Sequence, residues 1–268
     1  MYDIDYIRKK LASFGNEEKS KNIKYWKPNN ATIRFLPFPD ETENKQPFYE
    51  IMFYSIPEMS ERDIVAPYQF GLKDPIMEYR ESIREKAWGP NADERHRNLF
   101  RILSPKTKYF SAIVERGKEN EGVFIWSFGQ TVCKSIYNIL ISDDFVNETV
   151  TDPYRGFDFN VSIFITEKMF KGKNVKEISI LPRMKSTPLH SSKVEVERLL
   201  GLVPNIKEYF KSLVESYDDL KQKLEAYLNI DVGLNKIDDS SVISYGSNED
   251  ENLANKVGNE LLEKLGKI

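Results

Sequence analysis

Hydrophobic and polar residues alternate along several short stretches of the chain, which is the pattern of β-strands with two different faces. The predicted strands cover residues 31–38, 47–56, parts of 99–128, 157–170 and 175–189. In the first of them, Ile33 and Phe35 face one way and Arg34 faces the other. Short polar loops join several neighbouring strands, so we expect antiparallel pairing.

Other stretches carry apolar residues three or four positions apart, which predicts helices. The clearest is 74–88, where Asp74 is a good N-cap, Pro75 suits the first turn and Gly89 ends the run. Further helices are predicted at 129–142 and 205–229, and short amphipathic segments lie near both ends of the chain.

Residues 106–129 combine basic and aromatic side chains in a predicted β-hairpin. Its candidate nucleic-acid contacts are Lys106, Lys108, Tyr109, Phe110 and Trp126, together with Arg34 from the first strand. Lysines pair with phosphates, and aromatic rings stack on unpaired bases. Strand alternation places Tyr109 and Phe110 on opposite faces, so both line one cleft only if a bulge intervenes. The alternative is that these aromatic residues form the core, as strand aromatics do in many folds.

The order of the elements predicts a mainly β protein with helices, of the α+β class. Strands interrupted by a helix are typical of an OB-fold, here a five- to six-stranded barrel core with a helical insertion and C-terminal helices. We divide the chain into a basic N-terminal arm (1–21), a core (22–230) with a helical subdomain (57–98), and an acidic tail (231–268) that ends in a short amphipathic helix.

Composition is that of a soluble globular protein, with 40% hydrophobic and 30% charged residues among 268. No apolar run approaches the roughly 20 residues of a membrane span, and no signal peptide is visible, so we expect a cytoplasmic location without membrane contact. Residues 230–268 carry eight acidic residues and four lysines. The net charge of the whole chain is −3, so the net charge of residues 1–229 is close to zero. Any basic surface is therefore local.

Residues for catalysis or metal binding are sparse. His96 and His190 belong to no metal-binding motif, and the single cysteine, Cys133, lies on a predicted apolar helix face without a nucleophile motif. No phosphate-binding glycine loop occurs. We therefore expect a binding protein rather than an enzyme, with a metal nuclease as a remote alternative.

Several motifs occur together in an order that points to a family. They are Trp26-Lys27 followed by ATIRFLP, Pro47-Phe48, the KTxYxxxI pattern from Lys106, ENEG at residues 119–122, and Phe128-Gly129. In these pieces the chain resembles the T-even phage single-stranded DNA-binding proteins, which are helix-destabilising, over about residues 5–230.

The resemblance implies an OB-fold with a cleft for one DNA strand, to which the six hairpin and first-strand candidates would belong. It also implies self-association along DNA through the basic arm at Arg8, Lys9 and Lys10, and recruitment of replication proteins through the acidic tail. The family's Ser-Thr pair after the basic residues is replaced here by Leu-Ala-Ser.

The family's zinc site has no counterpart in this sequence. It takes one histidine and three cysteines, whereas residues 57–98 contain His96 and no cysteine. We expect no metal or other cofactor, and the apolar face of helix 74–88 (Ile76, Ile83, Ala87 and Trp88) to organise this subdomain in place of zinc.

These observations predict a sequence-independent single-stranded DNA-binding protein that coats and protects single strands in phage DNA replication, recombination and repair. An RNA-binding OB protein is one alternative. The other is a phage interaction or scaffold protein that binds no nucleic acid.

Overall fold

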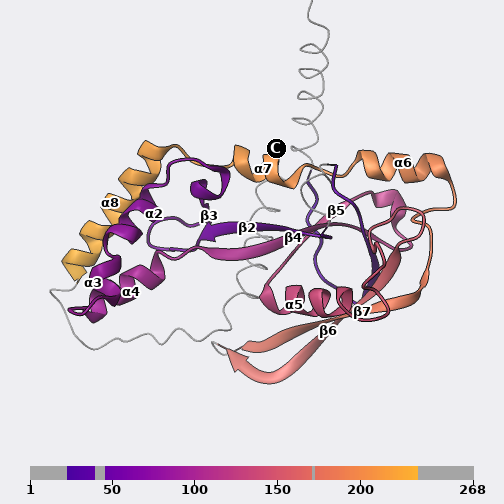
Figure 1. Ribbon diagram of the computed structural model, residues 1–268, viewed down its shortest axis with the longest axis horizontal. Helices are drawn as coiled ribbons and strands as arrows, with labels where there is room; N and C mark the ends of the chain where they lie inside the picture. Colours follow the sequence, from indigo (N-terminus) through magenta and orange to yellow (C-terminus); the bar gives the residue numbers. More distant parts are fainter. Residues whose placement is uncertain (1–22, 40–45, 171–172, 235–268) are drawn as a thin grey trace, which may run out of the picture. The chain divides into compact units, whose positions relative to one another are not determined.

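The computed structural model describes residues 23–39, 46–170 and 173–234, and the chain forms two compact units (Figure 1). Within the described residues, unit 1 covers 23–49 and 109–209, and unit 2 covers 50–108 and 210–234. The predicted arm at 1–21, and the tail beyond residue 234, lie outside the described residues. The fold is mixed α+β, and its strands pair antiparallel.

Unit 1 is built on an antiparallel sheet in the order β5-β4-β1-β6-β7. Its strands are β1 (Ala31–Phe35), β4 (Lys106–Glu115, whose first residues belong to unit 2), β5 (Phe124–Phe128), β6 (Phe157–Phe170) and β7 (Lys173–Ser186). These strands lie where the alternating pattern predicts them. The antiparallel sheet and the helices establish the α+β class. Closure of the sheet into an OB barrel stays a prediction.

One face of this sheet forms the core of unit 1. The ring of Phe35 stacks on Trp126 at 6.3 Å between centroids and meets Phe159 edge-on at 5.0 Å. The helix α5 (Gln130–Leu140) adds Val132, Cys133 and Ile136 to the same cluster. Cys133 is buried and forms no disulfide, as expected of a cysteine on an apolar helix face. Two further helices follow in sequence, α6 (Lys193–Gly201) and α7 (Ile206–Ser212).

Unit 2 holds a short strand pair and a group of helices (Figure 1). Its elements are β2 (Tyr49–Tyr54), β3 (Ile64–Val65), η1 (Pro67–Phe70), α2 (Pro75–Ser82), α3 (Arg84–Trp88), α4 (Glu94–Ile102) and α8 (Tyr217–Leu234). The predicted cap is confirmed, because the Asp74 carboxylate accepts hydrogen bonds from the backbone N–H of Ile76 at 3.0 Å and of Met77 at 3.1 Å.

Three sequence predictions for helices and strands are corrected. The helix predicted at 74–88 is two helices, because the backbone leaves helical geometry at Ile83 (φ −95°, ψ 2°). Residues 99–102 belong to α4 rather than to a strand, since Leu99 and Phe100 pack into the core of unit 2 from a helix that Asp93 caps. The helix predicted at 205–229 is divided into α7 and α8, and α8 continues to Leu234.

Apolar side chains organise unit 2, as the sequence predicts, with one exception. Ile76, Ile83 and Ala87 are buried in its core together with residues of α4 and α8. Trp88 is the exception, because it is 52% exposed and does not belong to the buried face. The indole lies at the end of the short helix α3, where it meets Phe100 of α4 edge-on.

We expect this subdomain to fold without metal. Among the residues that the structure describes, no three His, Cys, Asp or Glu side chains are grouped so as to hold a metal ion. The expectation from the sequence is that purified protein contains far less than one zinc per chain by elemental analysis, and that a chelator leaves its thermal unfolding midpoint unchanged. One tightly held zinc per chain, or a clear loss of stability with chelator, would contradict this expectation.

Within the same described residues, no helix is long and apolar enough to cross a membrane.

Candidate nucleic-acid interface

The predicted hairpin is present as β4 and β5. Tyr109 pairs with Phe128, and Ser111 pairs with Trp126. Its connection contains Gly117 and Gly122, both at φ 89°, a conformation that glycine adopts more readily than other residues. The sequence therefore located this ribbon correctly. What it did not reveal is that every residue of β4 from Lys108 to Glu115 is buried, on both faces of the strand.

The aromatic candidates of the hairpin are core residues in this structure. Trp126 is 0% exposed, Phe110 is 4% exposed and Tyr109 is 9% exposed. Tyr109 stacks on Phe128 at 5.9 Å between ring centroids and meets Phe48 edge-on at 5.5 Å. A base can stack only on a ring that it can reach, so this burial favours the core alternative. A DNA contact by these three residues stays a prediction.

The lysines of the hairpin differ from each other. Lys108 is buried, forms an ion pair with Asp63, and its ammonium lies 5.3 Å from the ring centroid of Phe53. Its charge is therefore already compensated. Lys106 is partly exposed at the start of β4. Of the two, Lys106 is the better placed to meet a phosphate.

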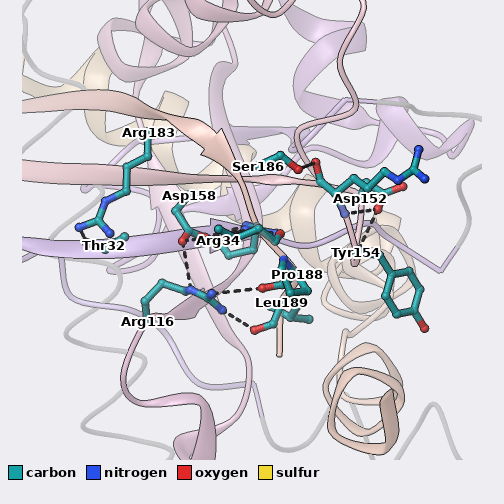
Figure 2. A network of polar contacts seen from close by, with 12 residues as sticks. Thr32, Arg34, Arg116, Asp152, Tyr154, Asp158, Arg183, Ser186, Pro188 and Leu189 are labelled. Carbon is teal, nitrogen blue, oxygen red and sulfur yellow. Dashed lines mark hydrogen bonds and ion pairs between the residues drawn. The ribbon is translucent and has the colours of Figure 1, made fainter. Parts of the chain in front are cut away.

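Arg34 is fully buried and takes part in a network of polar contacts (Figure 2). Its guanidinium donates from Nε to the Asp158 carboxylate at 2.8 Å, and from Nη2 to the Thr187 backbone oxygen at 2.9 Å and hydroxyl at 2.7 Å. Burial lowers the pKa of Arg34, and the nearby Asp158 carboxylate opposes this effect. In this conformation Arg34 binds the protein itself, and its predicted contact with DNA is untested.

Asp158 also holds a second arginine. The Nε of Arg116 lies 3.2 Å from the other oxygen of the Asp158 carboxylate. The Arg116 guanidinium further donates to the backbone oxygens of Leu189 and, at 3.2 Å, of Pro188 (Figure 2). Arg116 is partly exposed and also pairs with Glu119, at 3.4 Å, so the two guanidinium groups of the network face two carboxylates.

An exposed surface that the sequence reading missed lies beside this network, on the outer face of β1, β6 and β7. We define this outer face by Thr32, Asn160, Phe164, Leu181 and Arg183. Arg183 donates to the Asn160 side chain and to the Thr32 hydroxyl, each at 3.0 Å. Phe164 is 56% exposed and Leu181 is 62% exposed. The alternation of residues along β6 could have revealed this outer face, because Asn160 and Phe164 lie on the same face of that strand.

A turn at the edge of the network adds a second exposed aromatic and a further arginine. The Asp152 carboxylate accepts hydrogen bonds from the backbone N–H of Tyr154 at 2.8 Å and of Arg155 at 2.7 Å, which fixes the turn. The Ser186 hydroxyl donates to the Arg155 backbone oxygen at 2.7 Å, which ties the turn to the end of β7 (Figure 2). Tyr154 is 48% exposed, so its ring is available to a ligand.

The outer face and the turn together form a local basic surface on an acidic chain. Its exposed arginines are Arg155 and Arg183, whereas Arg34 is buried and Arg116 is paired with Asp158 and Glu119. Tyr154 and Arg155 are neighbours in the turn, and a guanidinium group next to an exposed ring can bind a phosphate while a base stacks on the ring.

The comparisons with known proteins agree with a nucleic-acid partner. A family model described as gp32 DNA binding protein like matches residues 27–228, which is most of the chain. The matched segment spans both the outer face in unit 1 and the helices of unit 2. A comparison with curated proteins found no match.

Proposed function

The chain belongs to the gp32-like family of DNA-binding proteins, and from this premise we propose that it binds single-stranded DNA without reading the base sequence. The family match over residues 27–228 is the observation that carries the proposal. The motifs ATIRFLP and KTxY, which suggest the same family, both lie inside the matched segment.

The exposed basic surface of unit 1 supplies a plausible binding mode. Arg183 and Arg155 are positioned for phosphates, and Phe164 and Tyr154 offer rings on which bases can stack. Every base has a flat face, so stacking tolerates any sequence and contributes about 1–3 kcal/mol per base. Such a surface needs no contact with base edges, which are what a sequence-reading protein requires.

Arg183 is held in place before any ligand arrives. Arg183 donates one hydrogen bond to Thr32 of β1 and one to Asn160 of β6. The Thr32 hydroxyl also donates to the Asn160 side chain, at 3.0 Å, which links the two acceptors. A side chain that is already ordered loses less conformational freedom on binding. This arrangement supports Arg183 as the principal phosphate contact of the outer face.

The remaining parts of the proposal extend beyond the described surface. We include a non-enzymatic role in phage DNA replication, recombination and repair, with Lys106 as an added phosphate contact. Cooperative self-association through Arg8, Lys9 and Lys10, and recruitment of replication proteins by the acidic tail, belong to the same proposal and rest on the resemblance.

A titration tests the proposed function. Fluorescence anisotropy of labelled oligo(dT), matched RNA and duplex DNA should show tightest binding to oligo(dT), weakening steeply as salt rises because counterions are released from the strand. Absence of binding to any single strand would overturn the proposal. Equal affinity for RNA would support the RNA-binding alternative.

Replacing Arg183 by alanine should weaken oligo(dT) binding by roughly tenfold, equivalent to about 1.4 kcal/mol. Loss of one phosphate contact should also reduce the slope of log K against log salt by about 0.7. The matched control is Arg198→Ala, since Arg198 of α6 is already paired with Glu195 at 2.7 Å. Equal effects of the two variants would show that only net charge matters, and not this position.

A further inference from the structure

Trp88 differs from the other two tryptophans of the chain. It is 52% exposed, whereas Trp26 is 6% exposed and Trp126 is 0% exposed. Trp26 and Trp126 pack against each other in the core of unit 1, with ring centroids 5.2 Å apart. A large apolar ring left half in solvent gains little from folding, so its position calls for another explanation.

Two arginines of the neighbouring helix lie against this ring. The guanidinium carbons of Arg97 and Arg101, one turn apart on α4, are each 5.6 Å from the Trp88 ring centroid. Phe100 meets the indole edge-on from the same helix, at 6.1 Å between centroids. The ring is therefore oriented by its neighbours while half of its surface remains accessible.

No carboxylate of the described residues pairs with either of these two arginines. Within the part of the chain that the structure describes, neither Arg97 nor Arg101 forms an ion pair, and the buried Nε of Arg97 has no hydrogen-bond acceptor. Arg80 and Arg84 of the same subdomain are different, because both pair with Glu81. Two uncompensated positive charges thus flank one exposed aromatic ring.

We propose that Trp88, Arg97 and Arg101 form a second contact site for single-stranded nucleic acid, in unit 2. A base stacks on the accessible part of the indole, and the guanidinium groups bind the adjoining phosphates. A nucleotide is the ligand that combines a flat ring with a neighbouring anion, and a base on an aromatic ring is a stable pairing. This inference rests on the proposed function and assigns part of the contact with the strand to Trp88.

Tryptophan emission provides a direct test, because Trp88 is the exposed fluorophore. Saturating oligo(dT) should quench the emission of the wild-type protein, and Trp88→Phe should remove most of that change. Binding itself is followed separately, by the anisotropy of a labelled oligo(dT). If the wild-type protein gives no anisotropy change, the proposed function fails. If it binds but its emission is unaltered, only the Trp88 site fails.

Two alanine variants test the site through affinity. Trp88→Ala and Arg101→Ala should each weaken oligo(dT) binding by roughly tenfold, with thermal unfolding showing that both variants are folded. The control is Arg84→Ala, which removes the same charge from an arginine that is already paired, and it should change affinity less than twofold. Unchanged affinity in both site variants would overturn the proposal.

An acidic protein segment is the competing ligand for an arginine-flanked tryptophan. Titration of the wild-type protein with poly-glutamate distinguishes the two, because a carboxylate chain has no ring to stack on the indole. Strong quenching by oligo(dT) and little by poly-glutamate is the expected result. Equal quenching by both polymers would overturn the assignment of a nucleotide to this site.

Discussion

Replacing Asp158 by alanine is expected to lower the free energy of unfolding by about 3–5 kcal/mol, as removal of one partner from a buried ion pair does. The carboxylate is 7% exposed and lies 2.8 Å from Arg34, whose side chain is 1% exposed. Without Asp158, Arg34 keeps its charge in a buried position and Arg116 loses its nearest carboxylate. Urea unfolding followed by circular dichroism measures the change.

The matched control for this variant is Glu195→Ala. Glu195 also pairs with an arginine at 2.7 Å, but its side chain is 40% exposed and that of its partner Arg198 is 39% exposed. Exposed ion pairs contribute about 0–1 kcal/mol, so this variant should remain close to wild type. Similar effects of the two substitutions would show that the Arg34–Asp158 pair does not stabilise the sheet as described.

Replacing Trp126 by alanine is expected to cost about 3–5 kcal/mol of stability, the usual range for removing a fully buried aromatic side chain. The ring is 0% exposed and contacts Trp26, Phe35 and Phe128. Where the variant is still folded, its affinity for oligo(dT) should stay within about twofold of wild type, since the ring is buried in this structure and stacking requires an accessible ring.

Trp126→Phe is the matched variant, because it keeps an aromatic ring in the core and should cost much less than the alanine variant. Thermal unfolding and oligo(dT) anisotropy, measured on both variants, separate packing from binding. A large loss of affinity in Trp126→Phe without a loss of stability would support the DNA contact that the sequence predicts for this residue.

Much of the fold follows from local patterns in the sequence. Strand alternation located β1, β4, β5, β6 and β7, and Asp74 with Pro75 marked the start of α2. Local patterns were less informative where contacts between distant residues decide whether a segment is helical. The break at Ile83 and the helical state of Leu99 and Phe100 depend on the core of unit 2, which includes residues of α8 more than a hundred positions away in the sequence.

The candidate site was harder to predict than the fold. The basic and aromatic residues of β4 suggested contacts with DNA. The strand is buried on both faces from Lys108 onward, and the alternation of residues along the sequence does not reveal this burial. Arg34 pairs with Asp158, 124 positions away, so its burial could not be inferred locally. Alternation marks Phe164 and Arg183 as outward residues of their own strands, but only the pairing of β6 with β7 places both on one face of the sheet.

The core of unit 2 is built from apolar side chains of several helices. It joins residues of α2, α3 and α4 to Leu220 and Leu224 of α8. The same helices also carry Trp88 and its two arginines on the surface. Apolar packing on one side therefore fixes the geometry of the charged aromatic cluster on the other.

Photo-crosslinking is the most direct test of the central claim that exposed rings beside arginines bind single-stranded DNA. An oligo(dT) containing 4-thiothymidine is irradiated with the protein, and the crosslinked peptides are identified by mass spectrometry. We predict crosslinks on peptides that contain Tyr154, Phe164 or Trp88, all three about half exposed or more. Crosslinks confined to peptides without these residues, or none under saturating conditions, would contradict the account.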